Sequence, residues 1–494
     1  MDNYDADVIV VGAGPTGLML AGELGLHGIS VAVLDRLAEP MRQSRALGFS
    51  ARTIEEFGQR GLLARLGGVD VIPVGHFGGV PLDYRVLPGG SYGARGIPQS
   101  RTEAVLAGWA AEQGAVTHRS VEVTGLEQDA DGVTVHTSGG GAFDGGRLRA
   151  RYVVGCDGAR STVRRCAGID FPGTEPTVEL RFADISGVPL RPRFSGERVP
   201  GGMVMVLPLG PDRCRIIYYD RDEPLRASRE PITFAEVAAA FLKLSGEDIG
   251  AAEPSWVSST TDISRQAAQY RRGRVFVAGD AAHVHLPIGA QGMSAGVQDA
   301  VNLGWKLALV LAGQAPDGLL DTYHAERHPV GARILTNTLA QRTLYLGGEE
   351  ITPLTDVFAE LSRFESVQRS LVGMVTGLDI RHDVGPGGHP LLGRRLPDGE
   401  LTGEPGGGGP RTSVHELLHT GRGVLLDLGG DGTLPTAAKP WADRVDTVRA
   451  EGAAHLPDVE ALLLRPDGYV AWVAPDQDGS ALPEALERWF GPGA

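Results

Sequence analysis

The 494-residue chain has a formal net charge of −15, with 42% hydrophobic and 22% charged residues. This balance is typical of a globular protein of roughly two to four domains, and it argues against nucleic acid or an anionic membrane surface as a partner. No apolar run reaches the length of about 18 residues that a spanning helix needs, and no signal core opens the chain, so we expect a cytoplasmic protein. Cys156, Cys166 and Cys214 lack metal-ligand spacing, which predicts no metal site and assigns any redox chemistry to a bound cofactor.

The stretch from residue 7 to residue 35 has the pattern strand, turn, helix, strand. Val8–Val11 is a short apolar run typical of a buried parallel strand, and Ile29–Leu34 supplies a second strand. After the first strand comes a glycine-rich turn: Gly12, Ala13, Gly14, Pro15, Thr16 and Gly17. Such a turn brings backbone N–H groups close to a pyrophosphate at a helix N-terminus, and Asp35 can accept hydrogen bonds from ribose hydroxyls. The stretch predicts a dinucleotide site, for either FAD or NAD(P).

The segment after this motif supplies two candidate arginines. Arg36 is a plausible partner for adenylate ribose or phosphate, and Arg45 precedes a helix expected to begin near Ser50. The expected helix carries these apolar residues at helical spacing: Ile54, Phe57, Leu62 and Leu63. A solvated surface position is the competing interpretation of Arg45. A second helix is expected to open at residues 96–103, and residues 121–136 alternate as in a hairpin.

Two later stretches repeat the pattern of a strand followed by a turn with an acid. Residues 151–154 lead into a glycine turn with Asp157, and residues 274–278 lead into Gly279 and Asp280. Open α/β sheets bind ligands at the carboxyl ends of their strands, which is where both acids are expected. Residues 287–294 then open a long helix. Because a glycine-lined helix N-terminus attracts anions, it can stabilise negative charge on a reduced flavin.

Together these motifs resemble the class A flavoprotein aromatic hydroxylases. The resemblance rests on the first glycine turn with Asp35, on Cys156-Asp157-Gly158 with Arg164, and on Gly279-Asp280 with its downstream helix. A finer similarity, to hydroxylases of aromatic polyketide biosynthesis and particularly of angucyclinones, rests on four segments: 76–79 (HFGG), 97–100 (IPQS), 321–324 (DTYH) and 465–468 (RPDG). The resemblance extends over nearly the whole chain.

The resemblance implies that FAD spans the molecule, with the pyrophosphate at the first glycine turn and the ribose at Asp35 and Arg36. It implies that these residues bind the middle of the cofactor: Arg45, Gln99, Val123, Asp157 and Asp280. The isoalloxazine would be edged by Pro287, Gly289, Gln291, Gly292 and Met293. The family commonly reads Gly-Gly-Gln-Gly-Met-Asn in this loop, whereas this chain has Ala290 and Ser294. Since the family's contacts here are largely backbone N–H groups, we expect cofactor binding to persist.

The expected fold class is α/β combined with α+β. A discontinuous Rossmann-like FAD-binding domain, like that of para-hydroxybenzoate hydroxylase, would comprise residues 1–75, 96–173 and 270–385. Residues 76–95 and 174–269, whose strands alternate at 178–185, 203–209 and 213–219, would form an antiparallel substrate-binding domain. Residues 386–494, with strands at 423–427, 461–464 and 469–473, would form a thioredoxin-like domain without CxxC, so thiol–disulfide exchange is excluded there.

The resemblance also implies the chemistry. The sequence has no second nucleotide fingerprint, so NAD(P)H would visit the FAD site transiently, and the reduced flavin would take up O₂ as a C4a-hydroperoxide. Its terminal OH would be transferred to a phenolic ring of a polycyclic aromatic polyketide, such as an angucyclinone, and no protein nucleophile is expected. A homodimer follows by family analogy only. The sequence leaves the choice between NADH and NADPH open.

Several alternatives remain open at this level. The protein could be a rifamycin- or phenol-type flavin monooxygenase, or a non-hydroxylating FAD protein that sequesters an aromatic antibiotic. A flavin-dependent halogenase is disfavoured because no Trp-x-Trp-x-Ile-Pro stretch is present.

The side chains that would contact the substrate are weakly specified. His76 and Phe77 are candidates to line the substrate cavity, while a hydrogen-bonded structural role competes for His76, His283 and His285. Arg381 lies where related hydroxylases present an arginine towards the substrate, and it is the one catalytic candidate, with a surface ion pair as its alternative.

Overall fold

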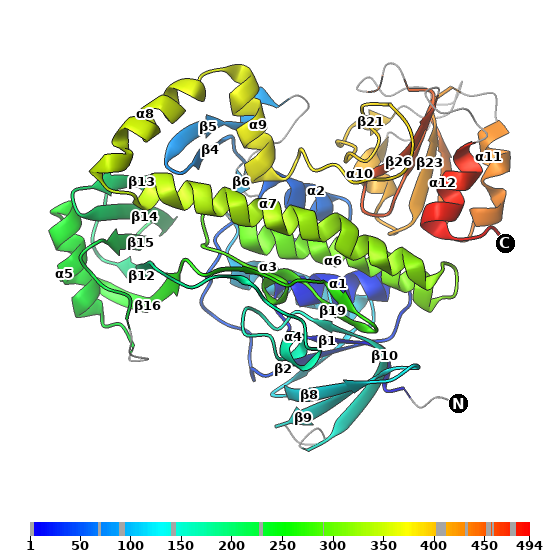
Figure 1. Cartoon of the computed structure of the whole chain (residues 1–494), viewed down its shortest axis with the longest axis horizontal. Coiled ribbons are helices and arrows are strands. Elements are labelled where there is room, and N and C mark those ends of the chain that lie inside the picture. The colour runs from blue at the N-terminus through cyan, green and yellow to red at the C-terminus, as the bar shows by residue number, and fades with distance from the viewer. Residues whose placement is uncertain are drawn as a thin grey trace.

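The computed structural model describes residues 4–67, 71–87, 94–139, 145–226, 231–289, 291–401, 412–429, 433–450, 456, 459–474 and 481–494. Ala290, one of the two departures in the expected flavin loop, lies outside these ranges. The chain folds around three main sheets, which Figure 1 shows at the bottom, the left and the upper right of the molecule. No helix in the described ranges is long and apolar enough to cross a membrane.

The first sheet is built on parallel strands. Their order is β19 (Val275–Val277), β10 (Arg147–Gly155), β1 (Ala6–Val11), β2 (Val31–Asp35) and β7 (Val116–Arg119). Each neighbouring pair in this row is parallel. The central strands β1 and β2 are buried except at Asp7 and Asp35, and the buried residues form apolar runs, as in parallel strands covered on both faces. Their carboxyl ends therefore meet along one edge, as the sequence predicted.

A hairpin extends this sheet on one side. β8 (Glu122–Gln128) and β9 (Val133–Ser138) pair antiparallel, and β9 continues onto β10. This confirms the hairpin expected over residues 121–136. On the other side, β18 (Arg271–Arg272) pairs antiparallel with β19.

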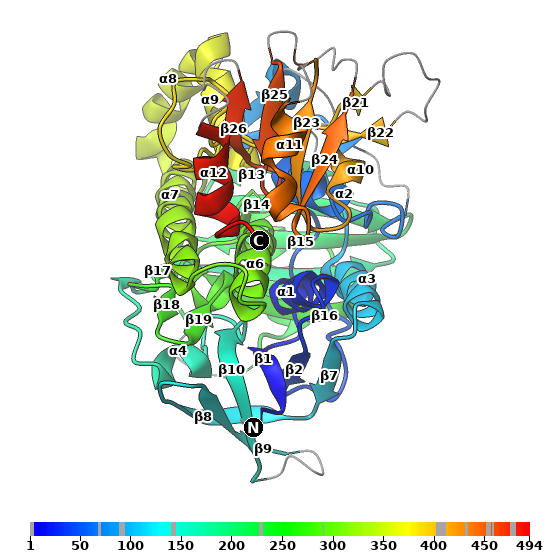
Figure 2. The same ribbon diagram turned by 90° about the vertical axis from the view of Figure 1, so that its right-hand side faces the viewer.

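Helices α1 (Pro15–Leu26), α3 (Gln99–Glu112) and α6 (Gln291–Leu311) lie side by side over this sheet, as Figure 2 shows. Glycines allow their close packing. A Cβ on Gly22 of α1 would lie 2.2 Å from the Trp109 ring of α3, and a Cβ on Gly304 of α6 would lie 2.5 Å from Cβ of Glu23. A short helix, α4 (Thr162–Cys166), follows β10.

One sequence expectation about helix length is wrong. Helix α2 (Ala51–Gly58) begins after Ser50 as predicted, but it ends before Leu62 and Leu63. The reason is backbone geometry, because Gly61 adopts a φ of +66°, which a right-handed helix does not allow. Leu62 is nevertheless fully buried, so its apolar character reflects core packing and not helix periodicity.

The second sheet is antiparallel throughout, as expected. Its order is β13 (Arg193–Val199), β14 (Gly202–Gly210), β15 (Arg213–Asp220), β12 (Glu179–Ser186) and β16 (Glu253–Thr261). Helix α5 (Phe234–Ser245) covers one face, and Figure 1 shows it at the far left. Small elements border this lobe: β3 (Val71–Ile72), β4 (Val74–Phe77), β5 (Val80–Asp83), β6 (Ala94–Arg95), and a 3-10 turn at Tyr84–Val86. A three-stranded sheet, β11 (Gly173–Thr174), β17 (Ser264–Gln266) and β20 (His283–Val284), lies at its base.

Helix α7 (Asp321–Leu346) runs along the molecule from the C-terminal side to the second sheet (Figure 1). After it, α8 (Thr352–Leu361) and α9 (Glu365–Thr376) cover the β4–β5 hairpin. Short 3-10 turns occur at Gly279–Ala281, Asp317–Leu320, Glu349–Ile351 and Lys439–Trp441.

The C-terminal unit contains the third sheet. Its order is β24 (Val445–Arg449), β23 (Gly423–Asp427), β25 (Ala461–Leu464) and β26 (Val470–Ala474), with only the β23–β24 pair parallel. Helices α10 (Val414–Leu417), α11 (Thr433–Ala437) and α12 (Ala481–Phe490) flank it, and β21 (Glu400–Leu401) pairs with β22 (Thr412–Ser413). Its core includes Trp472, Trp489 and Phe490 and reaches Trp305 of α6, so the unit packs directly on the first domain.

Candidate active site

The predicted nucleotide motifs converge on the carboxyl edge of the first sheet. The backbone N–H of Gly12 donates to the carbonyl of Leu34 over 2.7 Å, and that of Cys156 donates to Val11 over 2.8 Å. The N–H of Ala278 donates to Gly155 over 3.0 Å. The turns after β1, β2, β10 and β19 are therefore joined directly to one another, although they are far apart in the sequence.

The first glycine turn has the shape that a phosphate needs. Gly12 has a φ of +105°, and a Cβ there would lie 2.4 Å from the carbonyl oxygen of Cys156. A Cβ on Gly17 would lie 2.0 Å from the oxygen of Gly12, whereas nothing lies within 4 Å of the Cβ position of Gly14. Gly14 is the N-cap of α1 and supplies no side-chain cap. An open space thus faces uncapped backbone N–H groups, a fit for the cofactor's pyrophosphate.

Thr16 joins three of the motifs. A Cβ on Gly279, just after β19, would lie 2.7 Å from Oγ1 of Thr16, and a Cβ on Gly296 of α6 would lie 2.3 Å from the same atom. The start of α1, the β19 turn and the first turns of α6 therefore pack on one hydroxyl group. Pro15, at the first position of α1, is buried beside it.

Asp35 ends β2 and points back at the glycine turn. Its Oδ2 accepts a hydrogen bond from the N–H of Ala13 over 2.7 Å, and its Oδ1 accepts one from Leu37 over 2.8 Å. Arg119 lies 3.5 Å from Oδ1. A carboxylate offers about four acceptor positions, so capacity remains for ribose hydroxyls. Arg36, next to it, is exposed.

The segment that carries Arg45 is anchored from two sides. Gln99, at the start of α3, donates from its backbone N–H to the carbonyl of Ala46 over 3.1 Å, and Ser44 and Ser100 share a hydrogen bond of 3.0 Å. From the second sheet, Arg215 donates to the carbonyl of Arg45 over 2.9 Å. The Arg45 side chain itself is exposed and close enough to Asp280 to lower the pKa of that carboxyl group.

Asp157 caps a helix, and Val123 packs in the core. Oδ2 of Asp157 accepts hydrogen bonds from the N–H groups of Thr162 and Val163, over 2.6 and 3.1 Å, and so caps the start of α4. Its Oδ1 is buried and has no hydrogen-bond partner among the described residues. Val123 is buried in β8.

The Asp280 side chain is exposed to solvent although many protein atoms surround it. Its side chain is exposed, yet desolvation by the protein around it raises the pKa of its carboxyl group, against the opposing influence of His283 and Arg45. The Asp280 carboxyl group is therefore reachable from solvent although much protein surrounds it, as the predicted cofactor contact requires.

A buried carboxylate holds the Asp280 turn in place. Asp299 of α6 accepts a hydrogen bond from the N–H of Gly279 over 3.1 Å, and it lies 2.7 Å from both His283 and Arg327. Burial alone would raise the pKa of Asp299, but His283 and Arg327 keep it below its usual value. His283 therefore has the structural role that competed with a functional one in the sequence.

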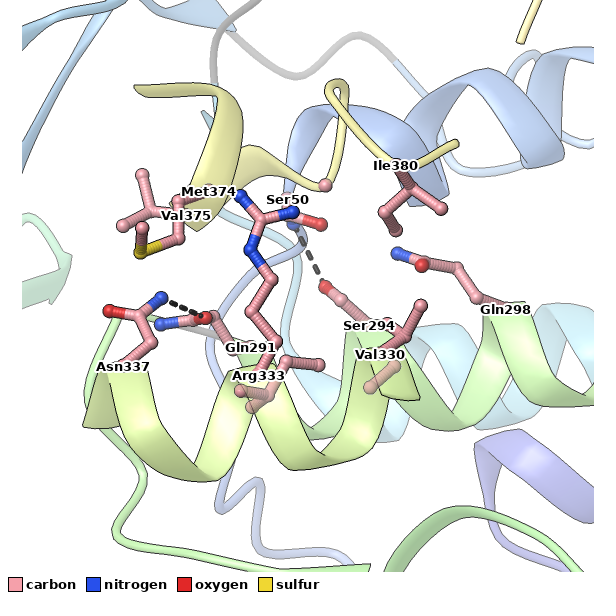
Figure 3. Close-up of a pocket in the computed structure, with 13 residues that line it drawn as sticks. Ser50, Gln291, Ser294, Gln298, Val330, Arg333, Asn337, Met374, Val375 and Ile380 are labelled. Carbon is pink, nitrogen blue, oxygen red and sulfur yellow. Dashed lines mark hydrogen bonds between the residues drawn. The ribbon is translucent and has the colours of Figure 1, made fainter. Parts of the chain in front are cut away.

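The expected flavin loop lies between β20 and α6. Pro287 and Gly289 are exposed, Gly289 has a φ of +71°, and Gly292 and Met293 are half-buried. Ser294, the second departure from the family pattern, accepts a hydrogen bond at its Oγ from the N–H of Ser50 over 2.9 Å (Figure 3). The hydroxyl thus joins the start of α6 to the start of α2. Burial lowers the pKa of nearby His285 to about 4, so its ring is neutral.

Comparisons with known proteins establish the family. Residues 5–338 match the family described as "FAD binding domain", and residues 389–493 match "Aromatic-ring hydroxylase, C-terminal". The chain is a member of the FAD-dependent aromatic-ring hydroxylases.

Two relatives of known structure and one characterised by sequence match the chain over essentially its whole length. The crystal structure of AlpK is 68% identical with a TM-score of 0.91, covering 100% of both chains. CabE, an aromatic hydroxylase from angucycline biosynthesis, is 53% identical with a TM-score of 0.94, covering 99% of this chain and 100% of its own. The 12-dehydrotetracycline 5-monooxygenase/anhydrotetracycline 6-monooxygenase of Streptomyces rimosus is 44% identical, covering 99% of each chain.

In this hydroxylase the second sheet turns a half-buried apolar face towards the flavin loop. Val204, Val206 and Ile216 point to the α5 side, so the alternating residues point to the other side. These include Met205, Leu207, Ile217 and Tyr219, all half-buried. Met205, Ile217 and Tyr219 pack in one cluster with Leu286 and Ile288, which lead into the flavin loop, and with Tyr345 of α7.

His76 and Phe77 lie at the border of this lobe. The His76 ring stacks on Tyr345, with centroids 5.6 Å apart, and its Nδ1 accepts a hydrogen bond from Gly79 over 3.3 Å. Burial lowers the pKa of His76 to about 4. Phe77 packs on Phe358 of α8 at 5.3 Å.

Arg381 borders a different cavity from the one that Gln291 lines, although the neighbouring Ile380 lines the latter. It is exposed, its Nε donates to the carbonyl of Leu392 over 2.8 Å, and it borders a surface cavity of about 330 Å³ formed by residues 381–387 and Leu392. None of those lining residues belongs to the flavin loop or the second sheet. Its catalytic role stays a prediction.

Sequence analysis missed the residues that support the site. Asp299, Arg327 and Arg215 are buried charges whose partners are distant in the chain. Asp299 lies in α6 between Val297 and Val301, and a charge on such an apolar helix face is the signal that would have pointed to it. Arg327 lies in a polar stretch of α7, so the sequence around it gives no such signal. No pattern in the sequence links Arg215 to the backbone of Arg45.

Proposed function

We propose that the chain hydroxylates a fused polycyclic phenol of the angucyclinone kind, with NAD(P)H and O₂ as co-substrates. The observation that carries this proposal is the apolar face of the second sheet beside the flavin loop. Its aliphatic and aromatic side chains span two adjacent strands, with Met205 directly opposite Ile217. A flat multi-ring substrate can bury more surface on such a face than a single phenol ring can. The aromatic hydroxylase CabE from angucycline biosynthesis and the tetracycline-type monooxygenase of S. rimosus support the same substrate class.

The residues of the proposed site have separate tasks. Bound FAD accepts hydride from NAD(P)H and activates O₂. The turn at Gly12–Gly17 would hold the pyrophosphate by backbone N–H groups, and Asp35 and Asp280 would accept hydrogen bonds from hydroxyls of the cofactor. The start of α6, with Gln291, Gly292 and Met293, would place positive backbone ends at the ring edge and favour negative charge there. The apolar cluster of Met205, Ile217 and Ile288 would exclude water from the reacting ring.

Other features belong to the same proposal. The mixed four-stranded C-terminal sheet with flanking helices is compatible with a thioredoxin-like unit, and no cysteine occurs in residues 386–494. We further propose the domain bounds given by the sequence, a homodimer and a cytoplasmic location where NAD(P)H is available. Light scattering of the purified holoenzyme tests the dimer.

Mass spectrometry under ¹⁸O₂ tests the activity. The FAD-loaded enzyme is supplied with NADPH or NADH and with a panel of angucyclinones, anthracyclinones, anhydrotetracycline, rifamycins and simple phenols. We expect one labelled oxygen in a polycyclic phenol and little turnover of simple phenols. NAD(P)H oxidation without labelled product in any class would contradict the proposal and favour an oxidase or a sequestering protein.

A further inference from the structure

Three buried side-chain amides form a continuous hydrogen-bonded chain between the β4–β5 hairpin and the flavin loop. Gln341 and Asn337 lie one turn apart on α7, and Gln291 is the first residue of α6. Nε2 of Gln341 donates to Oδ1 of Asn337 over 2.9 Å, and Nδ2 of Asn337 donates to Oε1 of Gln291 over 2.8 Å. Figure 3 shows the second of these bonds, beside a small cavity between α6, α7 and α9.

Both ends of this amide chain are backbone groups. At one end, the N–H of Gly78 donates to Oε1 of Gln341 over 3.2 Å, and at the other, Nε2 of Gln291 faces the carbonyl of Ile288 over a longer 3.5 Å. A backbone N–H can only donate and a carbonyl can only accept, so the two ends fix the direction of every amide between them. All three side chains are almost completely buried. The amide chain therefore has one arrangement, and its bonds polarise one another.

The end at Gly78 is tightly packed. Gly78 is at the tip of the β4–β5 hairpin and has a φ of +58°, and a Cβ there would lie 2.7 Å from Cβ of Leu344 in α7. The same hairpin carries His76, stacked on Tyr345, and Phe77, packed on Phe358. A shift of the hairpin tip would therefore move the first hydrogen bond of the amide chain.

The end at Gln291 belongs to the flavin loop. The Cβ position of Gly289 lies 3.2 Å from Nε2 of Gln291 and within 4 Å of both amide atoms of Gln341. Breaking one link would leave donors and acceptors unsatisfied in a buried place, so the loop and the hairpin cannot move independently at low cost. Apolar side chains of similar size would fill the same space without linking the two segments.

We propose that Gln341, Asn337 and Gln291 are positioning residues that couple the hairpin bearing His76 and Phe77 to the flavin loop. In this arrangement a substrate that presses on the hairpin changes the position of the flavin loop, and a bound flavin favours one position of the hairpin. The inference rests on the proposed function, which assigns the flavin to this loop.

A double-mutant cycle on FAD affinity tests the coupling without any substrate. Gly78→Ala pushes the hairpin tip off α7, and Asn337→Leu removes the middle amide. The dissociation constant for FAD is measured by flavin fluorescence for the wild-type apoprotein, both single variants and the double variant. We expect each single variant to weaken FAD binding about threefold or more, and the double variant to be no weaker than Asn337→Leu alone, because coupled residues are not additive.

Thr338→Val provides the matched control. Thr338 is next to Asn337 and equally buried, but among the described residues its hydroxyl donates to carbonyls of its own helix, those of Ile334 and Leu335. In the Thr338→Val background, Gly78→Ala should keep its full effect on FAD affinity. If Asn337→Leu does not fold, as judged by circular dichroism, Gln341→Met replaces it in the cycle.

The possible outcomes distinguish a failure of the coupling from a failure of the proposed function. Additive effects of Gly78→Ala and Asn337→Leu, or no effect of Gly78→Ala on FAD affinity, would overturn the coupling while leaving the proposed function intact. A wild-type apoprotein that binds no FAD would overturn both.

Discussion

Arg465, in the turn between β25 and β26, donates hydrogen bonds to both carboxylate oxygens of Glu326 in α7, over 2.6 and 2.8 Å. Both side chains are buried. Asp467 of the same turn and Lys306 of α6 complete a group of two positive and two negative charges. Burial alone would raise the pKa of Glu326, but Arg465 and Lys306 hold it well below its usual value.

The same turn holds α2. Arg52 donates to the carbonyl of Asp467 over 2.7 Å, and Arg60, just after α2, donates to that of Pro466 over 3.0 Å. Helix α2 follows the Arg45 segment, and α6 follows the expected flavin loop, so the C-terminal unit holds two helices whose first residues border the proposed cofactor site. A unit without cysteines thus has a structural task in this enzyme.

Replacing Arg465 with Met should destabilise the protein strongly. The change leaves Glu326 and Asp467 buried without their main partner, and removing one member of a buried ion pair costs about 3–5 kcal/mol. Urea unfolding measures the loss. Arg369→Met is the control, because Arg369 pairs with Glu365 on the exposed surface of α9, where such pairs contribute about 0–1 kcal/mol. Equal stabilities of the two variants would show that the buried group does not hold the unit.

Local patterns predicted the elements around the glycine turn, and contacts between distant residues support them. The strand, turn and helix around Gly12 follow from apolar runs and glycine spacing, both of which are local properties of the chain. Arg465 and Glu326, by contrast, are separated by 139 residues. Their pairing depends on how the C-terminal sheet docks on α7, which no periodicity records.

Local sequence patterns do not predict the amide chain either. Gly78, Gln291 and Gln341 stand in three elements, and an isolated Gln in a helix is most often a surface residue. The failed expectation for Leu62 has a related cause, because burial in a core gives the same apolar signal as helix periodicity. Local sequence patterns therefore indicate candidate FAD-binding residues but not the buried residues that support them.

Stability should fall between pH 7 and pH 5 partly because of His382. Burial, with Arg465 and Arg327 as further causes, lowers the pKa of His382 to about 3, and its ring lies 4.3 Å from that of Tyr469. Its pKa is depressed in the folded state, so below about pH 6.5 the unfolded chain binds a proton that the folded protein rejects. Protonation of His382 in the unfolded chain then lowers the free energy of unfolding by about 2 kcal/mol at pH 5. Urea unfolding at pH 7 and pH 5 measures the free energy of unfolding. Between these pH values, His382→Gln should lose about 2 kcal/mol less of it than the wild type does. Equal losses in both proteins would show that His382 does not cause the pH dependence.

Gly12→Ala should abolish FAD binding. A Cβ at this position would lie 2.4 Å from the oxygen of Cys156, and the φ of +105° is one that only glycine adopts readily. Equilibrium dialysis with FAD measures the effect. Gly108→Ala is the control, since Gly108 is exposed in α3 with nothing within 4 Å of its Cβ position. That variant should bind FAD normally and gain about 0.5–1 kcal/mol of stability.

Asp280→Ala should weaken FAD binding about 10- to 100-fold, because a hydrogen bond to a charged group contributes about 1.5–3 kcal/mol. Asp212→Ala, at an exposed turn of the second sheet, should leave the affinity unchanged. Fluorescence titration of the two apoproteins gives both constants. Undiminished affinity in Asp280→Ala would remove this residue from the cofactor site.

Met205→Trp should discriminate against large substrates. Met205 is half-buried on the face that packs towards Ile288, so the added bulk enters the space assigned to a multi-ring phenol. Overpacking costs about 1–3 kcal/mol, which corresponds to a rise in KM of about 5- to 150-fold. FAD affinity should stay unchanged, because Met205 is on the second sheet and not among the nucleotide motifs. Leu242→Trp, exposed on α5 at the opposite side of that sheet, is the control and should have the wild-type KM. If Met205→Trp turns over four-ring phenols with the wild-type KM, this face of the sheet is not the substrate wall.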